Sequence, residues 1–421
     1  MARIATRPGF NSSHMGGLSM STAQQLYLLH DQFPTADAVP LATPHNCEPG
    51  PGALTVVDTE EKLSISDGVL VCAGAKASPA WGDPMLMTTG SYAVRAGLCF
   101  DCKITPTATN TWGDAGFYST ATPAAETDRF SVRFNNDATI SIMDKDEPHS
   151  PELGLMPYAG GTDYWVRVLC TSAGKNYYYS LDGATWYLIW ASTVGTTTPV
   201  WVGLANTSMA FSSDNWRLQE GIAVPSALAD DTFTRADSAL TLGSDSTGKA
   251  WTAVSGTWGI SSNKAYSASD ANFDIATIAS GGKDGIWEAT VSGTLASAVN
   301  YRIPALVFRY LDGLNFLLAY LLNSGLYLAK IDGGSLTALG AQLATTADGT
   351  DYLLRVVAAG NEITVVVLSP GDLALNAGIW YTLAGGDTKY NAYTTSGMVL
   401  IKAGSPATAA RWDGFKVQGG M

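Results

Sequence analysis

Cysteine spacing is the first feature of this chain that could support chemistry. Cys99 and Cys102 form a C-x-x-C pair, a motif that can be redox-active or supply half of a zinc site. The other cysteines and the histidines complete neither a second C-x-x-C nor an H-x-x-x-H motif. Because residues 98–104 are typical of a strand, and free cysteine is usually a small core residue, we expect buried structural thiols. A disulfide and a metal or redox site are the alternatives.

The acidic run Asp144-Lys145-Asp146-Glu147 is the second candidate, because hard cations such as Ca²⁺ prefer several oxygen ligands. The run lacks the glycine and the longer ligand spacing of an EF-hand loop, so we interpret it as a solvated turn. The four histidines offer no serine–histidine–aspartate arrangement either. These motifs predict neither a metal centre nor nucleophilic catalysis.

The composition excludes several classes of protein. The 421 residues are 46% hydrophobic and only 14% charged, and they suffice for two or three packed domains. The aromatic content is too high for a disordered chain, and no apolar run approaches the ~20 residues of a membrane helix. The net charge of −13 has the wrong sign for a protein that neutralises nucleic-acid phosphates. We therefore expect a globular protein that neither inserts into membranes nor binds nucleic acid.

The chain contains an internal repeat. Three pairs of segments match in the same order, namely 31–37 with 231–237, 163–168 with 351–356, and 214–218 with 413–417. Their offsets of 200, 188 and 199 residues are far longer than the period of a solenoid, so each copy should be a whole domain. We expect an N-terminal arm at 1–25, domains at 26–220 and 228–421, and a short linker at 221–227.

Each copy is predicted to be all β. Short runs rich in Val, Tyr, Trp and Ile alternate with Gly, Asn and Asp, which is typical of strands and turns. Between Tyr179 and Trp186, the pair Asp182-Gly183 supplies the positive φ that a tight hairpin needs. Convincing amphipathic helices are missing from the pattern. Such a copy favours a large two-sheet sandwich.

Several motifs resemble those of the concanavalin A-like, laminin-G-like jelly-roll family. Residues 308–316 (FRYLDGLNF) resemble the FR-x-x-D-x-x-N-Y strand pair of that family, residues 231–260 its opening strands, and residues 412–417 its closing strand. The first copy departs from the pattern at 117–142. The resemblance implies two tandem concanavalin A-like jelly-roll sandwiches. It implies less about function, because lectins, glycosidases, adhesion modules and phage structural proteins share the fold.

The resemblance raises the question of catalysis. Retaining glycosidases of this fold carry Glu-x-Asp-x-x-Glu on one strand, because the nucleophile and the acid/base must lie ~5.5 Å apart. Glu126 and Asp128 begin this pattern, but Ser131 stands where the acid/base should be. A hydroxyl cannot protonate a glycosidic oxygen as a carboxylic acid can. We therefore expect that the protein is not an enzyme.

The resemblance also implies candidates for a structural Ca²⁺, which many of these sandwiches hold between the first and last strands. The matching residues are Asp31 and Asp214 in the first copy and Asp231 and Asp413 in the second. The alternative is that these carboxylates cap turns at strand ends. No cofactor is required under either interpretation.

A carbohydrate site is a further expectation, because aromatic rings stack on sugar faces while a few polar groups fix their orientation. The concave sheets of the family would carry Arg309, Tyr310, Asn315 and Tyr320 in the second copy, and Trp112, Tyr118 and Arg133 in the first. For each aromatic residue the alternative is packing in a core.

The expected function is structural and adhesive. The N-terminus lacks the apolar stretch of a secretory signal, whereas the polar, aromatic-rich composition is typical of extracellular proteins. A virion protein reconciles the two, so we expect a capsid-decorating or tail-associated protein of a bacterial virus that touches host glycans. A secreted or surface carbohydrate-binding module and a degenerate glycoside hydrolase are the alternatives. Residues 1–30 are expected to dock on other virion subunits or on another copy, unless they are a passive leader.

Overall fold

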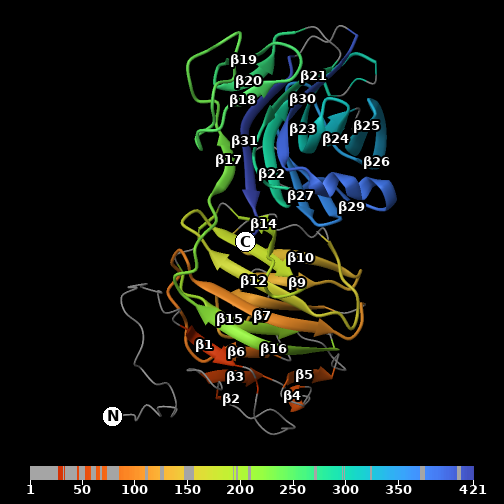
Figure 1. Ribbon diagram of the computed structural model, residues 1–421. Helices are drawn as coiled ribbons and strands as arrows, with labels where there is room; N and C mark the ends of the chain where they lie inside the picture. Colours follow the sequence, from red (N-terminus) through yellow and green to blue (C-terminus); the bar gives the residue numbers. More distant parts are fainter. Residues whose placement is uncertain are drawn as a thin grey trace, which may run out of the picture.

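The computed structural model is almost entirely β (Figure 1). It describes residues 27–31, 33, 45–46, 53–57, 63–66, 69–73, 85–109, 112–123, 128–146, 156–192, 194–195, 198–206, 210–269, 273–295, 297, 299–322, 325–369, 375–404 and 409–421. The arm expected at 1–25, Cys47 and Glu126 lie outside these residues. Within them, no helix is long and apolar enough to cross a membrane.

The first half of the chain forms two antiparallel sheets. Sheet A contains, in order, β14 (Tyr187–Ala191), β13 (Lys175–Ser180), β12 (Tyr164–Cys170), β7 (Cys99–Pro106), β16 (Ala210–Gln219), β5 (Val69–Ala73) and β4 (Leu63–Ser66), with β1 (Tyr27–Asp31) paired to β16. Sheet B contains β11 (Met156–Pro157), β10 (Thr139–Asp144), β9 (Arg129–Phe134), β8 (Gly113–Tyr118), β15 (Trp201–Asn206), β6 (Met85–Thr88), β3 (Ala53–Val57) and β2 (His45–Asn46).

The second half also forms two antiparallel sheets. Sheet C contains β29 (Leu375–Thr382), β28 (Glu362–Leu368), β27 (Tyr352–Ala359), β22 (Gly285–Ser292), β31 (Arg411–Gly419), β20 (Lys264–Ser267) and β19 (Trp258–Ser261), with β17 (Ala227–Asp231) paired to β31. Sheet D contains β26 (Ser335–Leu343), β25 (Gly325–Asp332), β24 (Asn315–Leu322), β23 (Tyr301–Asp312), β30 (Thr395–Ala403), β21 (Phe273–Ile278) and β18 (Trp251–Ala253). A 3₁₀ helix, η2 (Gly385–Ala392), connects β29 to β30.

The two halves have the same strand order. Sheet C repeats the order of sheet A, and sheet D repeats that of sheet B apart from the terminal strand β2, with each strand of the main path replaced by the one fifteen positions later. The opening turns match as well, because Phe33 and Phe233 both have positive φ, at 48° and 52°. Their N–H groups donate to Asp31 and Asp231, respectively. The two halves therefore share topology and details of turn geometry.

Within each half the two sheets pack face to face around apolar side chains. In the second half, Trp287 of sheet C packs 5.7 Å from the Phe308 ring of sheet D. Its indole N–H donates to the Ser396 hydroxyl of sheet D at 2.6 Å. Because strand side chains alternate between faces, these contacts identify the inner face of sheet D, and the opposite face is its outer face.

The cysteines of the C-x-x-C pair lie on β7. Their separation of three residues places the two thiols on opposite faces of the strand, so they cannot pair with each other. Cys99, Cys102 and Cys170 are buried thiols outside any disulfide. Burial raises the pKa of Cys102 well above its ordinary value, which keeps the thiol protonated and unreactive. The expectation of buried structural thiols is confirmed for these residues.

The two halves pack directly against each other. Strand β14 lies against β22 and β27 (Figure 1), and Ile286, Val357 and Val366 of sheet C belong to the apolar cluster of the first half. The Met421 backbone exchanges two hydrogen bonds of 3.0 Å with Trp186. At Gly420 a Cβ atom would stand 2.1 Å from the Trp186 carbonyl oxygen, so this crossing has no room for a side chain. The junction therefore combines apolar packing with backbone hydrogen bonds.

Candidate functional site

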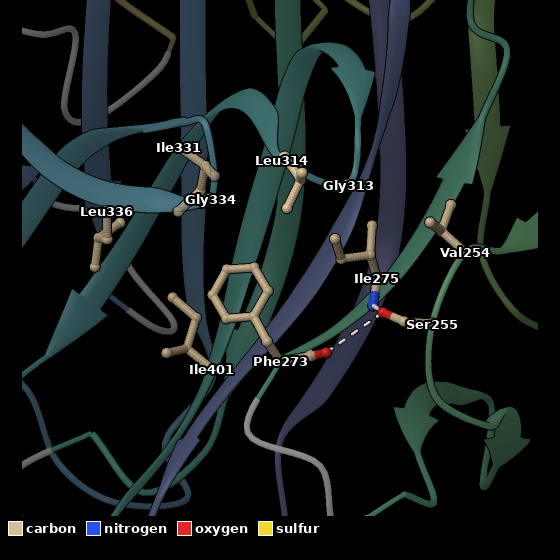
Figure 2. A pocket seen from close by; sticks show the side chains of 10 residues that line it. All are labelled: Val254, Ser255, Phe273, Ile275, Gly313, Leu314, Ile331, Gly334, Leu336 and Ile401. Carbon is tan, nitrogen blue, oxygen red and sulfur yellow. Dashed lines mark hydrogen bonds between the residues drawn. The ribbon is translucent and has the colours of Figure 1, made fainter.

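The outer face of sheet D carries a groove of about 600 Å³. Figure 2 shows its side chains converging on a common space around the Phe273 ring. Four strands and three turns supply the lining, namely Phe273 and Ile275 of β21, Ile401 of β30, Ile331 of β25, Leu336 of β26, and the turn residues Val254, Ser255, Gly313, Leu314 and Gly334. We call this feature the outer-face groove.

The outer-face groove is apolar. At its rim Val254, Leu314 and Leu336 are 43%, 58% and 49% exposed, which is unusual for side chains of this kind gathered in one place. Its one side-chain hydroxyl, Ser255 Oγ, accepts from the Ile275 N–H at 2.9 Å and donates to the Phe273 carbonyl at 3.3 Å. None of the described lining residues is charged. The groove can therefore bury an apolar part of an uncharged ligand.

A pair of tyrosines lies on the same face of sheet D. The rings of Tyr320 and Tyr327 stack with centroids 5.1 Å apart and an interplanar angle of 10°. Tyr320 lies four residues from Phe316 along β24, and Tyr327 lies four residues from Ile331 along β25. At the rise of a strand, this separation is ~13 Å. Burial, reinforced by Tyr327 and Tyr301, raises the pKa of Tyr320 to about 12. Its phenol is therefore a neutral hydrogen-bonding group at physiological pH.

Of the residues predicted in the second half, Tyr310 and Tyr320 lie on the groove side. The Tyr310 ring is 5.6 Å from that of Phe316 and stands beneath Gly313 at the rim. Asn315 instead joins two turns, since its amide donates to Asp312 and its oxygen accepts from the Gly333 N–H. Asn315 supports the rim of the groove without lining it.

Arg309 lies away from the groove. A positive φ of 50° at a register shift in β23 turns its side chain toward the loops, where it is fully buried. Its guanidinium donates to the carbonyls of Lys283 and Gly360 at 2.8 and 2.7 Å and to the Asp284 carboxylate at 3.0 Å. These bonds tie neighbouring loops together, and they leave Arg309 with a structural role.

The residues predicted as ligand contacts in the first half also divide into a residue with a structural role and residues that remain candidates. Tyr118 is fully buried, and its hydroxyl donates to Asp114 and accepts from the Ala205 N–H at 3.1 Å. Burial raises its pKa well above the ordinary value, and the negative charge of Asp114 adds to this effect. Arg133 and Trp112 do lie together, because the guanidinium stands 5.0 Å from the indole centroid. This pair is the first-half feature that remains a ligand candidate.

The position of the missing acid/base is also buried. The Ser131 hydroxyl donates to the Asp114 carboxylate at 2.9 Å, and Arg129 donates to the same oxygen at 2.6 Å. All three side chains are almost fully buried on sheet B. They form a compact polar cluster that holds β8 and β9 together.

Each of the four candidate Ca²⁺ ligands already has a partner within the protein. Asp231 accepts hydrogen bonds from the Phe233 N–H, from both Nη atoms of Arg235 and from Trp251 Nε1, all between 2.7 and 2.9 Å. Asp31 and Asp214 accept from backbone N–H groups two residues and one residue ahead, and Asp413 stands 3.5 Å from Lys264. No group of three or more metal-binding side chains is found in the described part of the chain. These contacts fit the turn-capping alternative.

The Asp231→Ala substitution separates the two interpretations. We expect it to lower the free energy of unfolding by about 2–4 kcal/mol, because it leaves the Arg235 and Trp251 donors without their acceptor. The matched control is Asp413→Ala, which removes a half-exposed carboxylate and should cost about 1 kcal/mol or less. Denaturant titrations with and without EDTA measure both effects. Destabilisation by EDTA that disappears in the Asp231 variant would instead identify a bound cation.

The comparisons with known proteins leave the family open. No protein-family model and no curated protein matches the chain. Among solved structures it is similar to the carbohydrate-binding module CBM66 from Bacillus subtilis, at 17% identity over 39% of this chain and 91% of that one, with a TM-score of 0.31. It is also similar to the CBM2 module of the evolved Dit of Lactobacillus casei phage J-1 (13% identity, 46% and 95% coverage, TM-score 0.32). A third is the xylan β-1,4-xylosidase from Bacillus halodurans (9% identity, 93% and 99% coverage, TM-score 0.32). Likenesses at these scores carry no conclusion about this chain.

Proposed function

We propose that this protein is a non-catalytic adhesive protein that binds neutral glycans on the outer face of sheet D. The observation that carries the proposal is the outer-face groove, where the Phe273 ring and exposed aliphatic side chains surround about 600 Å³ of space. Glycan sites combine apolar contact to sugar faces with a few polar groups that orient them. The phenols of Tyr320 and Tyr327 supply such groups on the same face of the sheet.

The non-catalytic part of the proposal is supported by the polar cluster on sheet B. Ser131 occupies the position that the acid/base has in the glycosidase motif, and its buried hydroxyl already donates a hydrogen bond to the Asp114 carboxylate. A buried hydroxyl cannot protonate a leaving group as a carboxylic acid does. The purified protein should therefore release no reducing sugar from bacterial surface polysaccharide. A degenerate glycoside hydrolase, which is one alternative, would behave in the same way.

The setting that we propose is the virion of a bacterial virus, with two tandem concanavalin A-like jelly-roll sandwiches in a capsid-decorating or tail-associated protein. The shared strand order and the matched turns of the two halves support the tandem arrangement. A secreted or surface carbohydrate-binding module is the alternative, and it would use the same groove. Copurification with intact particles distinguishes the two settings. The docking role expected for residues 1–30 falls largely outside the described residues and stays a prediction.

Binding to purified bacterial surface polysaccharides, measured by calorimetry on the full chain, tests the function. We expect the Phe273→Ala substitution to weaken binding at least tenfold, because it removes the ring at the centre of the groove. The matched control is Leu240→Ser, which changes a leucine that is 83% exposed and does not line the groove. Circular dichroism verifies that both variants are folded. Equal binding by the two variants would show that sheet D is not the binding face.

A further inference from the structure

We infer that the outer-face groove selects glycans by a methyl-bearing substituent, such as the C6 methyl of a 6-deoxyhexose or an acetyl group, in preference to an unsubstituted hexose. The inference rests on the proposed function and makes its ligand specific. It follows from how few hydrogen-bonding groups the groove has to offer.

The side-chain hydroxyl and several backbone N–H groups around the groove already form hydrogen bonds within the protein. Ser255 Oγ is hydrogen-bonded to two backbone groups. The N–H groups of Val254 and Ser255 donate to the Ile275 carbonyl at 2.8 and 3.1 Å. On the opposite wall, the N–H of Leu314 donates to Asp312 at 2.8 Å and that of Gly334 to the Leu314 carbonyl at 3.0 Å. A hexose placed here would bury hydroxyl groups without partners, which is unfavourable.

The rim of the outer-face groove is preorganised for apolar contact. Leu314 in the turn between β23 and β24 and Leu336 at the start of β26 remain about half exposed. The turn between β25 and β26 lies next to the turn of Leu314. The two turns are joined by Asn315, which donates to Asp312 and accepts from the Gly333 N–H. At Gly334 a Cβ atom would stand 3.2 Å from Leu314 Cδ2, so the two turns are in close contact. A methyl group can therefore be covered without ordering new segments of chain.

Charge and geometry favour a substituted glycan over other apolar ligands. The described lining has no charged side chain, and the chain as a whole carries −13, so an anionic amphiphile would be repelled. The stacked Tyr320–Tyr327 pair lies ~13 Å from Phe316 and Ile331 along the same face of the sheet. This distance is within reach of a neighbouring sugar ring of the same glycan. The groove holds the apolar substituent while the tyrosines contact the polar remainder.

L-Fucose and L-galactose form a matched pair of probes, because they differ only in a hydrogen or a hydroxyl at C6. In saturation-transfer NMR with the full chain, we expect the strongest transfer at the fucose methyl protons and a preference of about tenfold or more over galactose. A surface polysaccharide before and after mild de-O-acetylation tests acetyl groups in the same way. The Leu314→Ser substitution should remove the preference, and Leu240→Ser should keep it.

The outcomes separate the inference from the function on which it rests. Binding of both sugars with equal affinity, or a preference that survives Leu314→Ser, would overturn the inference and leave glycan binding intact. The absence of binding to every sugar and polysaccharide would overturn the proposed function itself. Transfer at the fucose methyl group that Leu314→Ser abolishes would support both.

Discussion

Replacing Trp190 by alanine is expected to lower the free energy of unfolding by about 3–5 kcal/mol and to separate the unfolding of the two halves. Trp190 is fully buried on β14, and its indole lies 3.7 Å from the guanidinium of Arg355 on sheet C. Arg355 is in turn paired with Glu288. Removal of the indole leaves a cavity in the junction and uncovers this ion pair, so both halves lose a shared part of their core.

Trp380 provides the matched control. It lies on β29, the strand of the second half that corresponds to β14, but it is 44% exposed and bonds only to Glu362 in the described contacts. Trp380→Ala should cost about 1 kcal/mol or less. Scanning calorimetry should show one transition for the wild type and this control, and two for Trp190→Ala. A single transition at an unchanged temperature in Trp190→Ala would contradict a shared core.

A second large effect is expected at Asp101. This carboxylate is fully buried on β7, where it accepts from Arg167 at 3.1 Å, from Arg217 at 2.9 Å and from Gln219 at 2.8 Å. Asp101→Ala leaves two guanidinium groups without their counter-charge, and breaking a buried pair in this way typically costs about 3–5 kcal/mol. We expect a loss of that size in urea denaturation.

The control for Asp101 is Asp163→Ala, which removes an exposed carboxylate 3.6 Å from Lys103 on the neighbouring strand. An exposed pair of this kind contributes about 1 kcal/mol or less. Asp101→Asn, which keeps the shape of the side chain but not its charge, should fall between the two. Equal stability of the alanine variants at positions 101 and 163 would show that the buried cluster contributes little.

The strand content and the repeat could be predicted from the sequence because they depend on local patterns. The hairpin at Asp182-Gly183 is an example, since Gly183 has the φ of +70° that the pair implies. The sequence also pairs Asp31 with Asp231 as equivalent positions, although the hydrogen bonds that each carboxylate accepts depend on the folded structure. Of the side chains that donate to Asp231, Arg235 is four residues away in the sequence, whereas Trp251 comes from a different strand, 20 residues along the chain.

The groove could not be predicted, because its lining looks like ordinary core in the sequence. Ile275, Ile331 and Ile401 each lie in apolar runs of separate strands, and only the order of sheet D brings them to one face. The prediction of Arg309 as a ligand contact rests on the resemblance to the jelly-roll family, whose concave sheet would carry this residue. The register shift in β23 turns it to the loops instead. Register irregularities of this kind depend on tertiary packing.

The continuous junction between the halves has a mechanical consequence. A load applied at sheet D reaches the first half through the packed contacts of β14 and through the backbone bonds between Trp186 and Met421. The distance and direction from the groove to the first half are therefore fixed. A pulling force is not absorbed by the extension of a flexible linker between the halves. In the proposed virion setting, copies held on one particle would present their grooves at constant spacing, so that engagement of one groove would keep its neighbours aligned with a repeating surface polymer.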